Sequence, residues 1–163
     1  ALNIIIMMNN TASGPQKEAC ANRLTLANDL GEMPRFYAFV ETLCQRCHFP
    51  SSLCMEVQLA LEEVIVNVMN YAYPNEQGQH SIEVRYERND NMLEFEVSDD
   101  GIAFDPTAYT AVDIDAPLED RQVGGLGIHI ARNMMDSMAY RREQNRNILT
   151  LRKSVAPYLT NQQ

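Results

Sequence analysis

The sequence lacks a long apolar run and is short of positive charge. None of its 163 residues belong to a stretch near the roughly 20 apolar residues that a membrane-spanning helix needs. The apolar segment 2–8 has no basic residue before it and no clear cleavage site after it, so we expect no secretory signal. Thirteen basic residues stand against 22 acidic ones, a net charge of −9. This charge disfavours nucleic acid and anionic membranes as partners and favours a neutral or basic protein.

The few cysteines and histidines of the sequence give only weak signals for a haem or zinc site. The four cysteines are Cys20, Cys44, Cys47 and Cys54. Without a secretory signal they are expected to be reduced, mostly buried thiols of a cytoplasmic protein. The run from Cys44 to His48 matches the c-type haem attachment pattern, but its cysteines occupy packing positions of a predicted helix. A haem or redox protein is therefore a minor alternative, and no second Cys or His pair has zinc spacing.

The ordinary apolar share of 45% predicts one globular domain with a proper core. We expect a flexible leader at 1–17, a domain at 18–156 and a loose tail at 157–163. Periodicity and turn residues predict, in order, a strand at 23–27, helices at 33–47 and 53–73, a hairpin of 81–88 with 92–98, a long loop, a helix at 127–136 and a hairpin of 138–144 with 148–153. Ser51 or Ser52 is expected to cap the second helix. Hairpin connections favour a two-layer α+β sandwich, with helices on one face of a mixed, mostly antiparallel sheet.

The helix predicted at 53–73 has an unusual polar face. Its apolar stripe should pack on the sheet, and Glu63, Asn67 and Asn70 fall on another face. Asparagine is a weak helix former, so its recurrence there favours a ligand role. An Asn carbonyl suits Mg²⁺ beside phosphates, and a carboxylate one turn earlier suits a general base. Taken alone, the same residues also fit an ordinary solvated face.

Two further segments carry the chemistry of a nucleotide site. The strand ending at Ser98 runs into Asp99-Asp100-Gly101, which places a carboxylate that can accept from a purine amine beside a glycine that permits close approach. The cluster Gly124-Gly125-Leu126-Gly127 enters a helix whose first amides can bind an anion. It lacks the Lys-Ser/Thr of a P-loop. Each segment alone also fits an ordinary turn or hinge.

Together and in this order, these motifs resemble the GHKL (Bergerat-fold) ATPases, and within them the small bacterial anti-sigma-factor serine kinases. The resemblance spans about residues 22–155. Its matching pieces are Glu63-x-x-x-Asn67 with Tyr71-Ala72-Tyr73, Asp99-x-Gly101 with Phe104-Asp105-Pro106, and Gly124-Gly125-Leu126-Gly127 with Met135-Asp136.

The resemblance implies a role for each motif. Asn67 would ligate Mg²⁺, Glu63 would be the general base for a substrate serine, and Asp99 would bind the adenine amine of ATP with Gly101 beneath the ring. The segment Gly124, Gly125, Leu126 and Gly127 would bind the cofactor, with the amides of Gly125 and Gly127 on the phosphates. Residues 103–124 would form an ATP lid.

The resemblance also implies a serine protein kinase that acts as an anti-sigma factor in the cytoplasm. Its partners would be a sigma factor and a STAS-type anti-sigma antagonist protein, and a homodimer is expected. The alternative is an ATP-gated switch that binds a partner with little chemistry, which a Glu63 pointing into the core would favour.

The sequence departs from the family pattern at three places. Tyr71 stands where many relatives have His or Lys. Arg146-Asn147-Ile148 replaces a common Gly-Thr near the adenine. Arg121 falls in the predicted lid, within possible reach of a γ-phosphate.

Overall fold

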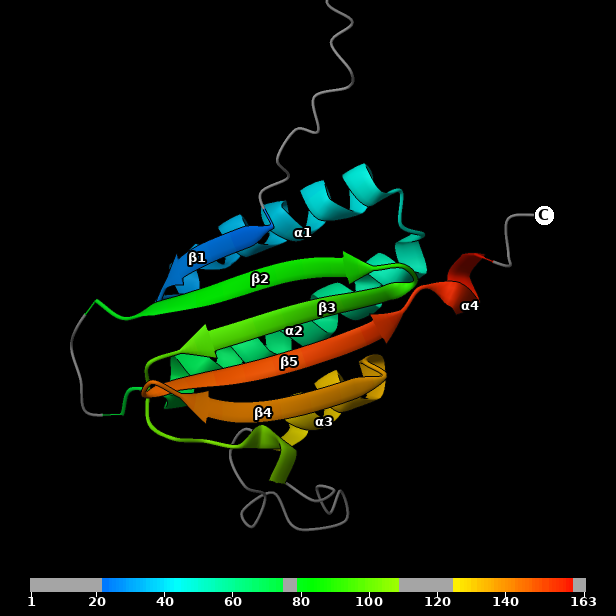
Figure 1. Ribbon diagram of the computed structural model, residues 1–163. Coiled ribbons are helices and arrows are strands. Elements are labelled where there is room, and N and C mark those ends of the chain that lie inside the picture. The colour runs from blue at the N-terminus through cyan, green and yellow to red at the C-terminus, as the bar shows by residue number, and fades with distance from the viewer. Residues whose placement is uncertain (1–21, 75–78, 109–124, 160–163) are drawn as a thin grey trace, which may run out of the picture.

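The computed structural model describes residues 22–74, 79–108 and 125–159, which form a two-layer α+β sandwich (Figure 1). One layer is a five-stranded sheet in the order β1-β2-β3-β5-β4. The strands are β1 (Arg23–Ala27), β2 (Ser81–Asn89), β3 (Met92–Asp99), β4 (Ser137–Glu143) and β5 (Arg146–Ser154). Every pairing among the described strands is antiparallel. The predicted two-layer sandwich with a mostly antiparallel sheet is confirmed, and all the described strand pairs are antiparallel.

The second layer consists of helices on one face of the sheet. Figure 1 shows α1 (Met33–Cys47), α2 (Ser51–Tyr71) and α3 (Gly125–Met134) behind the strands. Strand β3 illustrates the packing, because Leu93, Phe95 and Val97 are buried against the helices while Glu94 and Glu96 point to the other face. That outer face carries ion pairs between strands, such as Arg141 with Glu96 at 2.7 Å. The apolar faces of the strands and of the helices therefore pack against each other in a single core layer.

Helix α2 begins and ends earlier than the sequence predicts. Pro50 is its N-cap residue and no side chain caps it, so the predicted serine cap is wrong. The helix ends at Tyr71, two residues before the predicted Tyr73, and the backbone then turns to meet the end of β3. That turn is closed by the amide of Ile102, which donates to the carbonyl of Ala72 at 2.9 Å.

The second hairpin turns one position earlier than predicted. Its turn residues are Gln144 and Asn145, both with positive φ (47° and 63°), a geometry whose twist matches that of antiparallel strands. Asn147 was expected in this turn. It lies instead in β5, directly opposite Asp99 of β3. Helix α3 likewise runs from Gly125 to Met134 instead of 127–136.

The end of the described chain is helical, in contrast to the predicted loose tail at 157–163. A single turn, α4 (Ala156–Leu159), lies at the far end of the sheet from the β4–β5 turn (Figure 1). Tyr158 of this turn donates to Glu56 of α2 at 2.6 Å. The buried Lys153 also contacts Glu56 and donates to the carbonyl of Met134 at the end of α3. These contacts join three helices at one corner, and residues 160–163 lie outside the described ranges.

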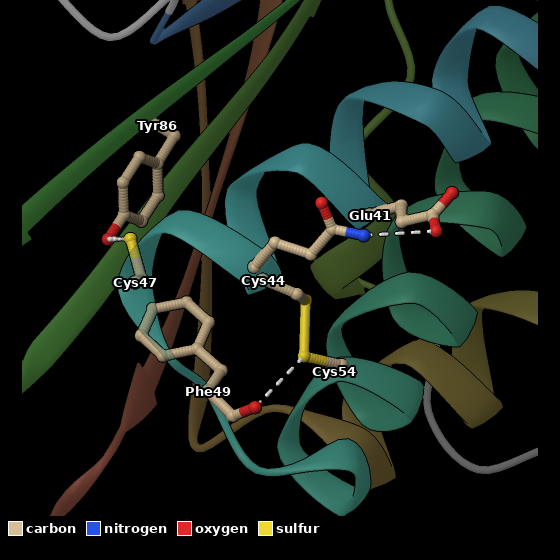
Figure 2. The surroundings of a disulfide bond; sticks show 7 residues. Glu41, Cys44, Cys47, Phe49, Cys54 and Tyr86 are labelled. Atoms are coloured by element: carbon tan, nitrogen blue, oxygen red, sulfur yellow. Dashed lines mark hydrogen bonds between the residues drawn. A yellow bond between two sulfur atoms is a disulfide. The ribbon is translucent and has the colours of Figure 1, made fainter. Parts of the chain in front are cut away.

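Cys44 and Cys54 form a disulfide between the end of α1 and the start of α2 (Figure 2). The helices meet here because the short link after Cys47 reverses the chain, which brings the two Cα atoms to 6.0 Å. The expectation of reduced thiols is wrong for this pair. Cys47 is free and lies 3.7 Å from the Tyr86 hydroxyl, while Cys20 falls outside the described residues. With Cys44 bonded to Cys54, the haem pattern is not available as two free thiols.

Candidate functional site

A pocket of about 100 Å³ opens between α2, α3 and the ends of β3 and β5. This volume is on the scale of an apolar cavity that holds a single aromatic ring. Aliphatic and aromatic side chains form most of its wall, and Asn67, Asp99 and Asn147 are the amide and carboxylate groups in it. The lining residues are Val64, Asn67, Val68, Tyr71, Ala72, Val97, Asp99, Ile102, Phe104, Pro106, Ile128, Tyr140, Asn147 and Leu149.

Asp99 is the buried carboxylate of this pocket. The residue is 4% exposed. Its Oδ1 accepts from the Gly101 amide and from Nδ2 of Asn147, each at 2.9 Å. Burial raises the pKa of the Asp99 carboxyl, although those two hydrogen bonds act in the opposite direction. No described residue donates to Oδ2, so this oxygen is left to accept a hydrogen bond from a ligand.

Gly101 lets the end of β3 pack directly on the end of α2. A Cβ at this position would lie 2.5 Å from the Cβ of Ala72 and 2.6 Å from its carbonyl oxygen. The sequence reasoning assigned this glycine to close approach of a ligand ring. In the structure its closest neighbour is the helix, and Gly101 is absent from the pocket lining. Its small size therefore positions the Asp99 turn.

Glu63 and Asn67 lie one turn apart on α2 and both face the side where α3 begins. Asn67 lines the pocket. Glu63 lies beside it, with its Oε2 so close to Gly127 that a Cβ on that glycine would overlap it. Glu63 is half-buried, so part of its side chain remains accessible. The polar face predicted for this helix is thus turned toward the start of α3.

Helix α3 presents backbone amides at this place. It begins at Gly125, and the first amides of a helix have no partner within the helix. Gly125 is buried, Gly127 is half-buried, and the Leu126 side chain is 53% exposed. Gly124 lies outside the described residues. The described part of the cluster can therefore offer amides to an anion beside Glu63 and Asn67.

Only the first residues of the predicted lid at 103–124 are described. Asp105 accepts from the amide and the hydroxyl of Thr107 at 2.8 and 2.6 Å, which opens the short 3₁₀ turn Pro106–Ala108. Arg132 of α3 donates to the carbonyls of Pro106 and Thr107, each at 3.2 Å. The start of this segment is thereby tied to α3. Residues 109–124, including Arg121, lie outside the described ranges.

The donors of the site fit a magnesium ion that is held mainly by a ligand. No group of three His, Cys, Asp or Glu side chains in the described ranges could hold a metal. The Asn67 amide oxygen is a hard donor that lines the pocket. Mg²⁺ commonly takes one or two protein oxygens and completes its shell with phosphates and water.

No helix within the described residues is both long and apolar enough to cross a bilayer.

Two residues of the site were missed or undervalued by sequence reasoning. Asn147 was placed in a turn and flagged only as a departure from the family pattern. Tyr140, which donates to it at 2.8 Å, was not considered. A signal was present, because residue 147 precedes Leu149 and Leu151 at the spacing of two that marks the buried face of a strand.

The chain is similar to a known domain family and to named protein kinases. The histidine kinase-like ATPase domain family matches residues 26–153. The serine/threonine-protein kinase BtrW of Bordetella bronchiseptica is 28% identical over 73% of this chain and 83% of its own length. The serine-protein kinase RsbW of Bacillus cereus is 26% identical over 58% of this chain and 60% of its own.

Among solved structures, the histidine kinase domain of a blue-light activated histidine kinase from Erythrobacter litoralis is similar at 17% identity and a TM-score of 0.48. The match covers 68% of this chain and 48% of the solved chain, so the present chain spans about half of that length.

Proposed function

Because the chain belongs to the histidine kinase-like ATPase domain family, we propose that it binds ATP with Mg²⁺ and transfers the γ-phosphoryl group to a serine of a partner protein. The observation that carries this proposal is the Asp99 carboxylate. One of its oxygens lacks a partner among the described residues, and it lies in an apolar pocket beside the start of α3.

Each of the three parts of the site binds a different part of Mg-ATP. The apolar pocket takes the adenine, whose amine donates to Oδ2 of Asp99. The amides at the start of α3 take the phosphates, because a helix N-terminus attracts anions. Asn67 lines the same pocket and supplies an oxygen to Mg²⁺, which would neutralise phosphate charge. These local sources of positive potential compensate for a chain with a net charge of −9.

Glu63 is the proposed general base. It takes the proton of the substrate serine hydroxyl as that oxygen bonds to the γ-phosphorus, and the bond from this phosphorus to the β–γ bridging oxygen breaks to release ADP. The position of the half-buried Glu63 against Gly127 favours this role. A Glu63 buried in the core would have favoured the alternative, an ATP-gated switch that binds a partner without phosphoryl transfer.

We further propose an anti-sigma role for the kinase. Two relatives are named as serine or serine/threonine protein kinases. The family resemblance then suggests a STAS-type antagonist protein as the substrate, a sigma factor as the second partner, a homodimer as the assembly and the cytoplasm as the location.

Nucleotide binding is tested with Asn67→Ala and Asp99→Asn, measured by calorimetry with Mg-ATP. Both variants are expected to lose at least about tenfold in affinity, since each removes a contact to a charged group or an ion. Asn70→Ala is the matched control, because Asn70 is exposed one turn further along the same helix. Unchanged ATP affinity in both site variants would refute the nucleotide site.

Phosphoryl transfer is tested with γ-labelled ATP and a recombinant STAS-type antagonist protein from the same genome. Glu63→Gln is expected to lower the transfer rate by roughly 10²–10⁴-fold with ATP affinity nearly unchanged. Glu62→Gln is the matched control, since Glu62 accepts from Tyr37 at 2.8 Å on another side of α2. ATP binding without transfer to any such protein would support the switch instead.

A further inference from the structure

We propose that Asn147 is a positioning residue that makes the site select a base with an exocyclic amine. It does so by holding Asp99 as a hydrogen-bond acceptor with one oxygen left for the base. This role rests on the proposed binding of ATP at Asp99. It concerns the position where this chain departs from the Gly-Thr of the family resemblance.

The hydrogen bonds of Asn147 use its whole amide group. Nδ2 donates to Oδ1 of Asp99 at 2.9 Å and to the carbonyl of Ile102 at 2.8 Å, so both amide hydrogens are engaged. Oδ1 accepts from the Tyr140 hydroxyl and from Nη1 of Arg142, each at 2.8 Å. Arg142 can only donate and the Ile102 carbonyl can only accept. The orientation of the amide is therefore determined by its surroundings.

This arrangement restricts what Asp99 can do. Its Oδ1 already receives two hydrogen bonds, from Asn147 and from the amide of Gly101. Both favour the ionised carboxylate against burial and the nearby Asp100, and Arg146 acts in the same direction as the two donors. Oδ2 then meets the base as an acceptor. An adenine amine satisfies it, whereas a carbonyl oxygen on the base would face it lone pair to lone pair.

Asn147 also shapes the wall of the pocket next to Asp99. Besides Ile102, it contacts the Phe104 amide, which donates to its Oδ1 at 3.3 Å. Ile102 and Phe104 both line the pocket. A single buried side chain, 6% exposed, thus holds the carboxylate and the segment that follows it in one arrangement.

The test compares Mg-ATP with Mg-ITP, in which a carbonyl oxygen replaces the exocyclic amine of the base and N1 carries a hydrogen. Asn147→Asp keeps the size of the side chain and its acceptor for Tyr140 and Arg142, but places a carboxyl oxygen against Asp99. Asp99 then loses the donor that holds its Oδ1, and one of the two carboxyls takes a proton. With that proton on Oδ2, Asp99 can donate to the carbonyl of hypoxanthine. The preference for ATP over ITP, as a ratio of dissociation constants, is expected to fall about tenfold.

Two further variants make the result decisive. Asn145→Asp adds the same charge on the exposed turn of the same hairpin and is expected to keep the wild-type ratio. Asn147→Ala serves as the second test in case Asn147→Asp does not fold. It opens room for water beside the pocket, and it is also expected to lower the ratio of dissociation constants. Circular dichroism checks the fold of each variant.

The outcomes separate this role from the proposed function. Parallel loss of ATP and ITP affinity with an unchanged ratio would mean that Asn147 is merely structural, and would overturn the inference. Wild-type protein that prefers ATP, with the same preference in both Asn147 variants, would overturn it as well. Wild-type protein that binds neither nucleotide would refute the proposed function, and the role of Asn147 with it.

Discussion

Gly101→Ala is expected to destabilise the protein and weaken its proposed nucleotide site at the same time. The added methyl carbon would lie 2.5 Å from the Cβ of Ala72, 2.6 Å from its carbonyl oxygen and 2.9 Å from Oδ1 of Asp99. The first two are atoms of the end of α2, which cannot rotate away as a long side chain can. The turn after β3 must therefore move, and with it the Asp99 carboxylate.

The magnitude follows from the crowding. Overpacking by a methyl group costs typically 1–3 kcal/mol, so we expect about 2 kcal/mol in the free energy of unfolding. In a domain of this size that corresponds to a melting temperature roughly 4–8 °C lower. The assay is thermal unfolding followed by circular dichroism, together with Mg-ATP titration. Gly31→Ala is the control, because its nearest contact would be the Asp29 side chain at 3.2 Å on an exposed turn.

Gly127→Ala, in contrast, is expected to keep the stability of the protein and to lower its phosphoryl transfer. Its added methyl group would overlap only the carboxylate end of Glu63, a flexible group that can turn aside. Alanine in a helix is favoured over glycine by up to about 1 kcal/mol, so stability should be kept or slightly raised. Phosphoryl transfer should fall by roughly 10²-fold, because the proposed base is displaced.

The pair of glycine variants can contradict the reasoning in two ways. A Gly101→Ala protein with wild-type melting temperature and ATP affinity would show that the contact with Ala72 does not position Asp99. A Gly127→Ala protein with undiminished transfer would show that the place of Glu63 against α3 is irrelevant to catalysis.

Three further outcomes are expected. Burial raises the folded-state pKa of Asp99. The contribution of this carboxyl to stability is therefore fully present below its unfolded pKa of about 3.9 and is lost as pH rises through the folded pKa. The melting temperature of Asp99→Asn relative to wild type should accordingly increase as pH rises above about 4. Lys153→Met removes the cation that contacts Glu56 and the end of α3, and should lower the free energy of urea unfolding by about 2 kcal/mol, with partial recovery in the double variant with Glu56→Leu. Cys44→Ser with Cys54→Ser removes a link across 10 residues and should cost about 2–3 kcal/mol under non-reducing conditions, while wild type treated with reductant should approach the variant.

The elements of this protein could be read from local pattern. Alternation predicted β1 with its observed bounds, and helical spacing did the same for α1. Hairpin signals placed the four other strands to within a few residues. These predictions succeeded because one buried face of each element imposes its period on neighbouring residues.

The sequence also pointed to Asp99 as a candidate site residue, because a strand running into Asp-x-Gly is a local feature, and the structure places Asp99 in the pocket lining. Its partner was not. Asn147 is 48 residues away, and its place depends on a hairpin turn at Gln144 and Asn145, where a shift of one position reverses which side chains are buried.

Contacts between elements were decided by the packing alone. The place of Glu63 against Gly127 depends on how α3 lies on α2, and the link between Cys44 and Cys54 depends on the reversal between two helices. The periodicity of the sequence predicts which face of a helix is buried. Which residues lie beside its polar face depends on how all the elements pack together in the core. For this reason the sequence contained the chemistry of the site, and the tertiary structure determined which groups meet within it.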